Sequence, residues 1–353
     1  MPQATPVRAE PASGSDFAPL LRQVRAAGLL ERRRGRYALT VVTNLLALAA
    51  TATGIVLTGD SWWTLLLALP AAVFSARTAF IGHDSGHSQI AVTRRANRLL
   101  GLVHADLLLG MSYGWWNDKH NRHHANPNHV DKDPDVGVGA LVWTQRQAAA
   151  RAGFTRWLTR HQAALFFPLL LLEGVNLKVS SLLDLKRREA GERRLEATLL
   201  LLHAAGYATL LLSSMSPGKA LAFGLLHHAL FGLHLGMVFA PNHKGMEMPD
   251  PDGERWGHLR RQVLTSRNVR GGPVTDWFMG GLNYQIEHHL FPSMPRPHLR
   301  LARPLVRAHC RTSGLTYAET GLIDSYRQAL LHMHEVGAPL RAARGTGQGL
   351  EAL

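Results

Sequence analysis

Histidine is the residue type whose number and spacing in this sequence point to chemistry. The 353 residues include 20 histidines, and three short motifs concentrate them: HDSGH begins at residue 83, HNRHH at residue 120 and QIEHH at residue 285. Spacings of three and four residues bring side chains to one face of a helix. Imidazole is a common ligand of transition metals, and a bound metal keeps clustered histidines neutral. The motifs therefore predict a metal centre.

The apolar segments of the chain indicate which elements position these motifs. Residues 37–58, 62–82, 195–213 and 219–240 carry almost no charge, and the first would form a helix about 33 Å long, enough to cross a hydrocarbon core of about 30 Å. Short turns at 59–61 and 214–218 join them into two hairpins. Trp62 and Trp63 suit the aromatic belt of a membrane interface. We therefore expect an all-α integral membrane protein with four transmembrane helices in two hairpins.

Two shorter apolar stretches, 99–113 and 163–177, would each reach only about 22 Å as helices, and each contains an acidic residue. We expect them to be re-entrant or interfacial helices. With four spans and both termini inside, 37 of the 39 lysines and arginines lie on the inner side, as the positive-inside rule requires. The same topology places the histidine motifs on the inner face, in a cytosolic helical cap that holds the metal site.

Eight histidines share that face and are the predicted metal ligands: His83, His87, His120, His123, His124, His243, His288 and His289. Four nitrogen ligands suit one ion and eight suit two. The single cysteine, Cys310, excludes an intrachain disulfide, a cysteine-rich zinc site and a cysteine-ligated iron–sulfur cluster. The net charge of +14 would suit nucleic acid, but topology and anionic headgroups account for it, so we expect membrane lipid and no nucleic acid as a partner.

The three motifs, in this order and at these distances from the apolar segments, resemble those of the integral-membrane fatty-acid desaturases. The runs GMSYGWWNDKHNRHHANPNHVDKDPDV (110–136) and GGLNYQIEHHLFPSMPRPH (280–298) are similar to the acyl-lipid and front-end branch, in which glutamine opens the third motif. The resemblance covers roughly residues 35–330. It implies a non-haem di-iron enzyme that uses O₂ and two electrons to place a double bond in an acyl chain carried by a lipid, coenzyme A or a carrier protein.

Carried over position by position, the resemblance makes metal ligands of the seven motif histidines, and His243 in PNHKG matches a further ligand at the end of the last span. We expect Gln285 to be a weak ligand or a neighbour of the metal, and Asn242 to contact the site through water. Trp115 and Trp116 either pack against the head end of the substrate or anchor the protein at the interface. Acidic residues beside the motifs are candidates to accept the outer ring N–H groups and orient the ligands: Asp84, Asp118, Asp131, Asp133, Asp135 and Glu287.

The expected organisation is a cytosolic N-terminal segment (1–36), a membrane desaturase domain (37–320) and a C-terminal cytosolic tail (321–353). The first segment lacks the apolar core of a signal peptide, has no HPGG haem motif and is too short for the cytochrome b5 domain of some relatives. We therefore expect a separate ferredoxin-type or cytochrome b5-type electron donor with its reductase, and Arg260, Arg261 and Arg267 as the docking patch. The expected location is the cell (inner) membrane, with multiple spans and with both termini and the histidine motifs in the cytoplasm.

Two alternatives would use the same residues. A membrane di-iron fatty-acyl hydroxylase would insert oxygen where a desaturase removes a second hydrogen, and the histidine motifs alone do not separate these outcomes. The QIEHHLFP context favours desaturation. A membrane metal transporter would place its ligands at the bilayer midplane in broken helices. The motifs of this sequence lie instead at the ends of the apolar segments.

Overall fold

The computed structural model describes residues 15–250 and 252–342, so the expectations for residues 1–14 and 343–353 lie outside the described residues. The described part is mostly helical, with almost no strand, which confirms the predicted all-α class. Two three-residue strands pair in parallel, with Asn268 opposite Glu319. In chain order the elements are α1 (Ala18–Ala26), α2 (Arg34–Thr58), η1 (Trp62–Leu67), α3 (Ala68–Gly86), α4 (Arg94–Gly101), η2 (Leu102–Leu109), α5 (Tyr113–Ala125), η3 (Pro134–Val136), α6 (Gln145–Ala149), α7 (Gly153–Arg160), α8 (Gln162–Asp184), η4 (Leu185–Arg187), α9 (Ala190–Ser214), α10 (Pro217–His243), α11 (His258–Leu264), β1 (Asn268–Arg270), α12 (Pro273–Phe278), α13 (Gln285–Leu290), α14 (Arg296–Thr312), β2 (Glu319–Gly321), α15 (Leu322–Val336) and α16 (Ala338–Ala342).

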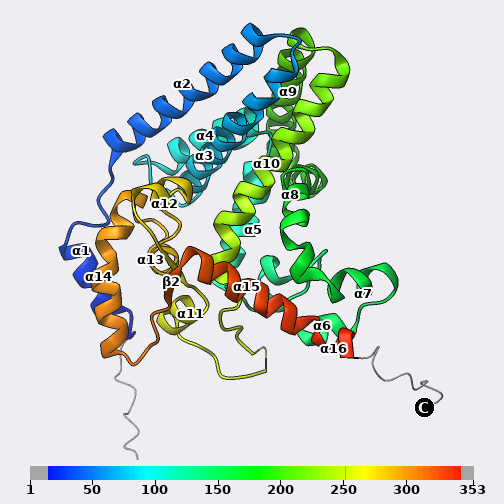
Figure 1. Cartoon of the computed structure of the whole chain (residues 1–353). Helices are drawn as coiled ribbons and strands as arrows, with labels where there is room; N and C mark the ends of the chain where they lie inside the picture. The colour runs from blue at the N-terminus through cyan, green and yellow to red at the C-terminus, as the bar shows by residue number, and fades with distance from the viewer. Residues whose placement is uncertain (1–14, 251, 343–353) are drawn as a thin grey trace, which may run out of the picture.

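The two predicted hairpins form the upper part of the molecule in Figure 1. Gly59, at a φ of +62°, ends α2, and the chain turns back through η1 into α3. The turn between α9 and α10 meets this first turn, since the carboxylate of Asp60 accepts from the backbone N–H of Ser216 at 2.8 Å and pairs with Lys219 at 3.2 Å. The two hairpin turns therefore lie at the same end of the bundle.

Within the described residues, five helical segments are long and apolar enough to cross a membrane: the four predicted ones and Gln162–Arg187, which contains α8. The expectation that 163–177 forms only a short helix is wrong in length, because α8 continues to Asp184. Its extension is held in place by Lys178, whose ammonium donates to the Leu109 carbonyl at 2.7 Å. The other short stretch, 99–113, is divided between α4, the π-helix η2 and the start of α5.

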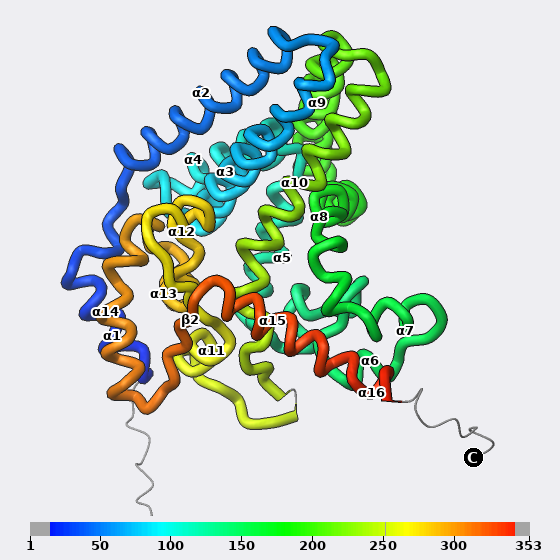
Figure 2. The backbone as a smooth tube through the Cα atoms, viewed as in Figure 1, coloured from blue at the N-terminus to red at the C-terminus, as the bar shows by residue number. Residues whose placement is uncertain are grey.

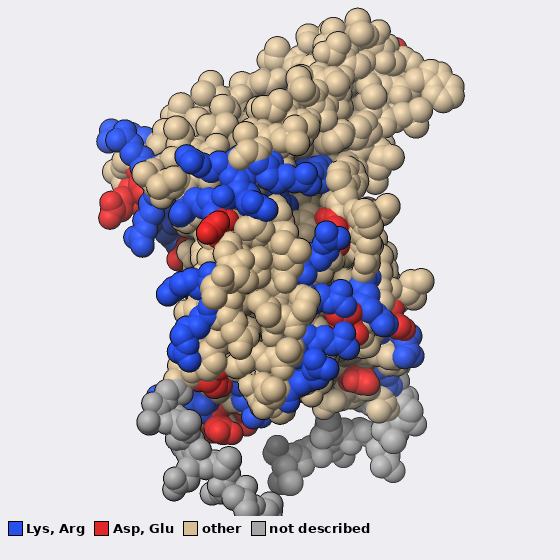
Figure 3. Space-filling view, turned by 90° about the vertical axis from the view of Figure 1, so that its left-hand side faces the viewer, with Lys and Arg blue, Asp and Glu red and all other residues tan. Residues whose placement is uncertain are grey.

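The surface separates into two zones that match this division. Leucines on α2, α3, α9 and α10 are exposed, for example Leu46 at 64% and Leu201 at 69%. In the space-filling view this upper zone is nearly free of charge, and a belt of lysine and arginine crosses the molecule directly below it (Figure 3). Exposed leucine is stable against lipid, whereas the belt suits headgroups and water. The all-α membrane fold is therefore supported by both shape and surface.

The lower part is a helical cap that joins the two ends of the described chain. The α1 helix packs against α14 (Figure 2). Buried residues of these two helices share one core with α11 and α13, which includes Leu20, Leu259, Ile286 and Leu299. Residues 321–342 pack on the same body, because α15 contacts α10 and α8. The cap therefore surrounds the ends of α3 and α10 that lie opposite the hairpin turns.

Candidate metal centre

Four elements carry the eight predicted ligands to one place. His83 lies in the last turn of α3 and His87 directly follows it, α5 carries the second motif, His243 ends α10, and α13 carries the third motif. The Ser112 hydroxyl begins α5 by accepting from the backbone N–H of Trp115 at 3.0 Å, which sets the face that α5 presents. Ligand atoms of these histidines form two groups, within each of which they lie no more than 4.8 Å apart.

The larger group contains five histidines: His83, His87, His120, His124 and His288. The Nε2 atoms of His83 and His288 are 3.1 Å apart, and those of His87 and His120 are 3.0 Å apart. The Nε2 of His120 also lies 3.1 Å from that of His124. Ring nitrogens from three different elements therefore converge on one small volume.

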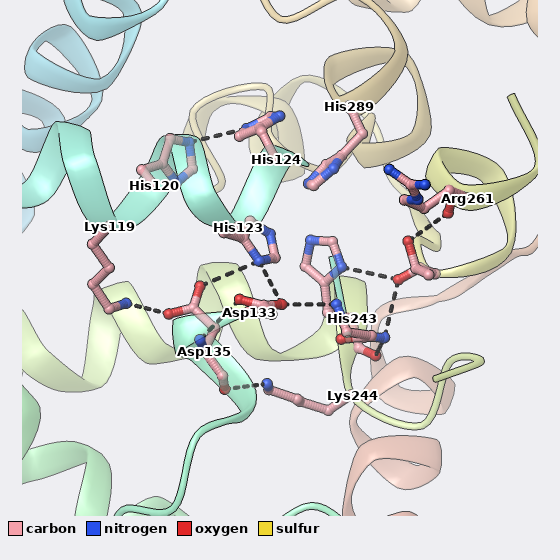
Figure 4. Close-up of polar contacts among 12 residues, drawn as sticks. Lys119, His120, His123, His124, Asp133, Asp135, His243, Lys244, Arg261 and His289 are labelled. Atoms are coloured by element: carbon pink, nitrogen blue, oxygen red, sulfur yellow. Dashed lines mark hydrogen bonds and ion pairs between the residues drawn. The ribbon is translucent and has the colours of Figure 1, made fainter. Parts of the chain in front are cut away.

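The smaller group contains His123, His243 and His289, whose ring centroids are 4.7 to 5.0 Å apart. Figure 4 shows these rings directed toward one another. The rings of His124 and His289 stack at 4.2 Å with an angle of 16° between them, so the two groups are adjacent. The eight predicted ligands thus form two neighbouring nitrogen clusters.

The outer nitrogens of four of these rings have partners that fix the ring orientation. His83 Nδ1 pairs with Asp84 at 3.0 Å, and His123 Nδ1 pairs with Asp133 at 2.9 Å. His243 Nδ1 donates to the Thr265 carbonyl at 2.9 Å and His289 Nδ1 to the Gln262 amide oxygen at 3.0 Å. A donor bond from Nδ1 leaves the lone pair on Nε2, the nitrogen that faces the cluster. The rings are therefore oriented as metal ligands are.

The electrostatics of the site favour the neutral form of five of these imidazoles. Burial, followed by the neighbouring imidazoles, holds the pKa values of His87, His120, His124, His288 and His289 well below the ordinary histidine value. Neutral imidazole is the form that binds a metal. The buried Nε2 of His289 has no hydrogen-bond partner within the described residues. Two clusters of inward-facing lone pairs fit two metal ions, because a bound cation would satisfy nitrogens that otherwise face one another.

The candidate acids divide into two sets. Asp84 and Asp133 accept from ligand rings as expected, and Asp135 lies 3.5 Å from His123 Nδ1 while it pairs with Lys119. Asp118 and Asp131 are exposed, and the structure places neither beside a ligand ring.

Glu287 is buried but its carboxylate turns away from the ligands. It accepts from the Asn268 amide and the Tyr317 hydroxyl, both at 2.7 Å, and burial raises its pKa to about 7. Asn268 in turn accepts from the backbone N–H of Ile286 at 2.9 Å. Glu287 therefore secures α13 to β1 and the C-terminal segment.

The structure places the two predicted amides and the two tryptophans as follows. The Gln285 amide nitrogen lies 2.9 Å from His243 Nε2, and Asn242 donates to the Gln285 amide oxygen at 3.2 Å. Trp116 stacks on the ring of His120 at 4.4 Å and meets the edge of His83 at 5.5 Å. Trp115 packs among the apolar residues between α3 and α10. Gln285 thus borders the smaller group and Trp116 borders the larger one.

Several further residues hold the ligands in place, although they lie outside the three histidine motifs. Gln262 orients His289 and donates to the His124 carbonyl at 2.9 Å, and Asn128 positions Asp133 through its backbone N–H at 2.7 Å. Arg296 pairs with Asp84, which pairs with His83. Arg296 belongs to the sequence PRPH, which ends the desaturase-like run 280–298, and this is the one sequence feature that indicates a role for it. No motif marks Gln262, because its contacts arise from the packing of α11 on α5 and α13.

The predicted docking patch needs one correction. Arg267 is fully buried and donates to the carbonyl oxygens of Pro241 and Lys244, so it stabilises the end of α10 and has no surface role. Arg260 is exposed, and Arg261 donates to the Ala125 carbonyl at 2.9 Å.

Comparisons with known proteins agree with this geometry. The sequence model of the family described as fatty acid desaturase matches residues 60–321. The chain is 31% identical over 317 residues to an acyl-lipid (9-3)-desaturase of Physcomitrium patens, covering 85% of this chain and 58% of the relative. It is 27% identical to a delta(8)-fatty-acid desaturase of Helianthus annuus, over 88% of this chain and 70% of the relative. It is 33% identical to fatty acid desaturase 3 of Bos taurus, over 88% of this chain and 71% of the relative. The match spans more than half of the chain, so this protein belongs to the fatty acid desaturase family of oxidoreductases, as its histidine motifs predicted.

Proposed function

We propose that this chain is a di-iron acyl desaturase that converts a –CH₂–CH₂– unit of a fatty acyl chain to –CH=CH–, with O₂, two electrons and two protons consumed and two water molecules formed. The observation that carries this proposal is the pair of adjacent imidazole clusters in a member of the desaturase family. The named relatives act on fatty acyl substrates, some of them as acyl-lipids. No observation favours the hydroxylase or the transporter.

The larger group would hold one iron and the smaller group the other. Bound iron supplies, with O₂, the oxidant needed to remove hydrogen from an unactivated methylene. The chain itself orients the ligands through Asp84, Asp133, Gln262 and the Thr265 carbonyl. Trp116 covers one side of His120 and so limits the access of water to the larger group.

We infer that four of the five candidate helices cross the membrane and that both termini and the metal centre face the cytoplasm. His83 at the end of α3 and His243 at the end of α10 belong to one centre, so the chain between them must cross an even number of times. The α9 and α10 helices supply two crossings, which leaves none for α8. Lysine and arginine also concentrate on the metal-centre side of the apolar zone (Figure 3).

This topology is tested with single reporter cysteines in a Cys310→Ala background. A maleimide that does not cross membranes should label Asp60→Cys from the side opposite to Arg25→Cys. Arg188→Cys, placed after α8, should be labelled from the same side as Arg25→Cys. Labelling of Arg188→Cys from the Asp60 side would contradict the four-span topology.

The function is tested by expression in a host of known lipid composition, followed by fatty-acid profiling. We expect new unsaturated acyl chains with the natural sequence and none with His123→Ala. His161→Ala, which removes an exposed histidine, is the matched control and should leave the products unchanged. Hydroxylated products would favour the hydroxylase, and one iron per active chain would contradict the di-iron assignment.

We further propose that a separate acidic carrier delivers the electrons beside Arg260 and Arg261. This surface adjoins the centre, because Arg261 binds the carbonyl of the residue that follows His124. Arg260→Glu should lower the rate at limiting donor and weaken its dependence on salt. An unchanged salt dependence would remove this surface from the electron route.

A further inference from the structure

Two adjoining cavities lie where α2 meets the start of α14 and α12. The outer cavity, of about 830 Å³, is lined by Pro297 and by residues 32–36, whose sequence is RRRGR. The inner cavity, of about 530 Å³, is lined by Arg36, Arg77, Arg296 and Arg300 among others. Arg36 and Pro297 border both cavities, so the two lie next to each other, and we call them together the arginine groove.

The groove has a strong excess of positive charge. Asp276 is the one acidic residue among its lining residues, and its carboxylate already accepts from Asn283 at 2.9 Å and from the Tyr284 hydroxyl at 3.2 Å. Among the described residues, no carboxylate forms an ion pair with Arg36 or Arg300. The N-termini of α2 and α14, which also favour negative charge, begin at the groove. A bound anion would therefore relieve the repulsion among these guanidinium groups.

The groove opens at the level of the membrane surface. On one side, α2 exposes Leu39 at 55% and Val42 at 51%, and on the other, α12 exposes Val274 at 80% and Trp277 at 47%. Arg77 lies over the Trp277 ring at 4.8 Å and donates to its carbonyl at 3.1 Å. Apolar and aromatic side chains that flank arginine are typical of the zone where lipid headgroups lie. An anion in this groove is thus within reach of the bilayer.

The walls of the groove are linked rigidly to the metal centre. The Tyr37 hydroxyl on α2 donates to Gln89 at 2.7 Å and accepts from the backbone N–H of Arg296 at 3.2 Å. The Arg296 side chain pairs with Asp84, and Asp84 pairs with the ligand His83. A molecule held in the groove is therefore positioned relative to the larger histidine group through three side chains.

We propose that the arginine groove binds the phosphate of a membrane phospholipid, the carrier of the acyl chain that this enzyme desaturates. Guanidinium groups bind phosphate oxygens in a bidentate manner, and the groove meets the membrane at headgroup level. The position at the lipid boundary favours a phospholipid over a water-soluble acyl thioester. The role of carrier rests on the proposed desaturase function, whereas phosphate binding does not.

Binding is tested directly on the purified full chain in detergent, before any electron donor is added. The probes are a short-chain phosphatidylglycerol, coenzyme A and inorganic phosphate, each titrated calorimetrically. The test variant is Arg36→Gln/Arg300→Gln. The matched control is Arg25→Gln/Arg307→Gln, which removes two exposed charges from α1 and from the same α14 helix. The single variant Arg300→Gln, with a thermal unfolding scan, serves if the double variant is poorly folded.

We expect the test variant to weaken binding of the short-chain phosphatidylglycerol at least tenfold and the control to change it less than twofold. Equal losses in both variants, or no loss in either, would overturn the site. A second outcome would overturn the lipid assignment. In it, the natural chain binds coenzyme A or inorganic phosphate as tightly as the lipid, and the test variant loses that binding. A chain that binds lipid in the groove yet forms no unsaturated product would contradict the proposed function and leave the groove intact.

Discussion

Two regions of the described molecule bring histidines close together, yet their ring nitrogens converge in the candidate metal centre and not in the second region. In the metal centre, ring nitrogens of different histidines lie 3.0 to 3.1 Å apart. The second region, between the membrane helices, contains His203, His227 and His228. The ring centroids of His227 and His228 are 5.1 Å apart. These three border a cavity of about 410 Å³ together with Lys178 and Tyr207.

The difference lies in what each ring nitrogen faces. His227 pairs with the Tyr207 hydroxyl at 2.8 Å and with the Ser75 hydroxyl at 3.1 Å. His203 binds the Leu107 carbonyl at 3.1 Å and accepts from Lys178 at 3.2 Å. Hydroxyl, carbonyl and ammonium groups satisfy these nitrogens, so no shared lone-pair cluster is left for a cation. Proximity of histidines is therefore not enough, because a metal site also needs lone pairs that converge.

The largest expected difference between the two regions follows from removing one ring in each. His124→Ala takes a ligand from the junction of the two groups and should lower desaturation more than about 100-fold, together with a loss of bound iron. His227→Ala removes a half-buried imidazole ring from the membrane region and should leave the iron content unchanged. Iron per chain and product formation are measured on both. Equal loss of iron in the two variants would contradict the conclusion that the histidines between the membrane helices take no part in metal binding.

A smaller effect is expected from the carboxylates that orient the ligands. Asp133→Asn weakens the acceptor of the His123 N–H and should reduce activity or iron affinity about 10- to 100-fold. Asp131→Asn, two residues away and exposed, should stay within about twofold of the natural chain. Activity across a titration of iron separates weaker metal binding from slower turnover. Similar losses in both variants would indicate a general effect of charge.

The end of α10 that bears His243 depends on a buried cation, unlike the middle of α10 that bears His227. Arg267→Met leaves the carbonyls of Pro241 and Lys244 without their donor and should lower the free energy of unfolding by about 3 kcal/mol. Arg327→Met, an exposed change on α15, is the control for thermal unfolding. A stability equal to that of the control would show that the hydrogen bonds of Arg267 do not hold the end of α10 in place.

The smallest expected effect belongs to the membrane region. Tyr207→Phe removes the hydroxyl that pairs with His227 and should cost about 0.5–1 kcal/mol in thermal stability, with iron content unchanged. A loss of iron in this variant would show that the membrane histidines support the centre after all. Iron analysis alongside the unfolding scan tests this directly.

Much of this molecule could be predicted from local pattern. Apolar length identified α2, α3, α9 and α10, and histidine spacing identified ligands that the structure brings together, because both depend on residues that are neighbours on one helix. The errors share a cause. The length of α8, the burial of Arg267 and the outward turn of Glu287 are set by partners remote in sequence: Leu109, Pro241 and Tyr317.

The sequence by itself determined the family, the membrane helices and the histidines that can act as ligands, since helical periodicity and hydrophobicity are local properties. Only the tertiary structure decided how the eight divide into a group of five and a group of three. It also decided that Gln262 and Arg296 support them and that the histidines between the membrane helices do not join them. These outcomes depend on where α3, α5, α10 and α13 end in space, and packing between helices sets those positions.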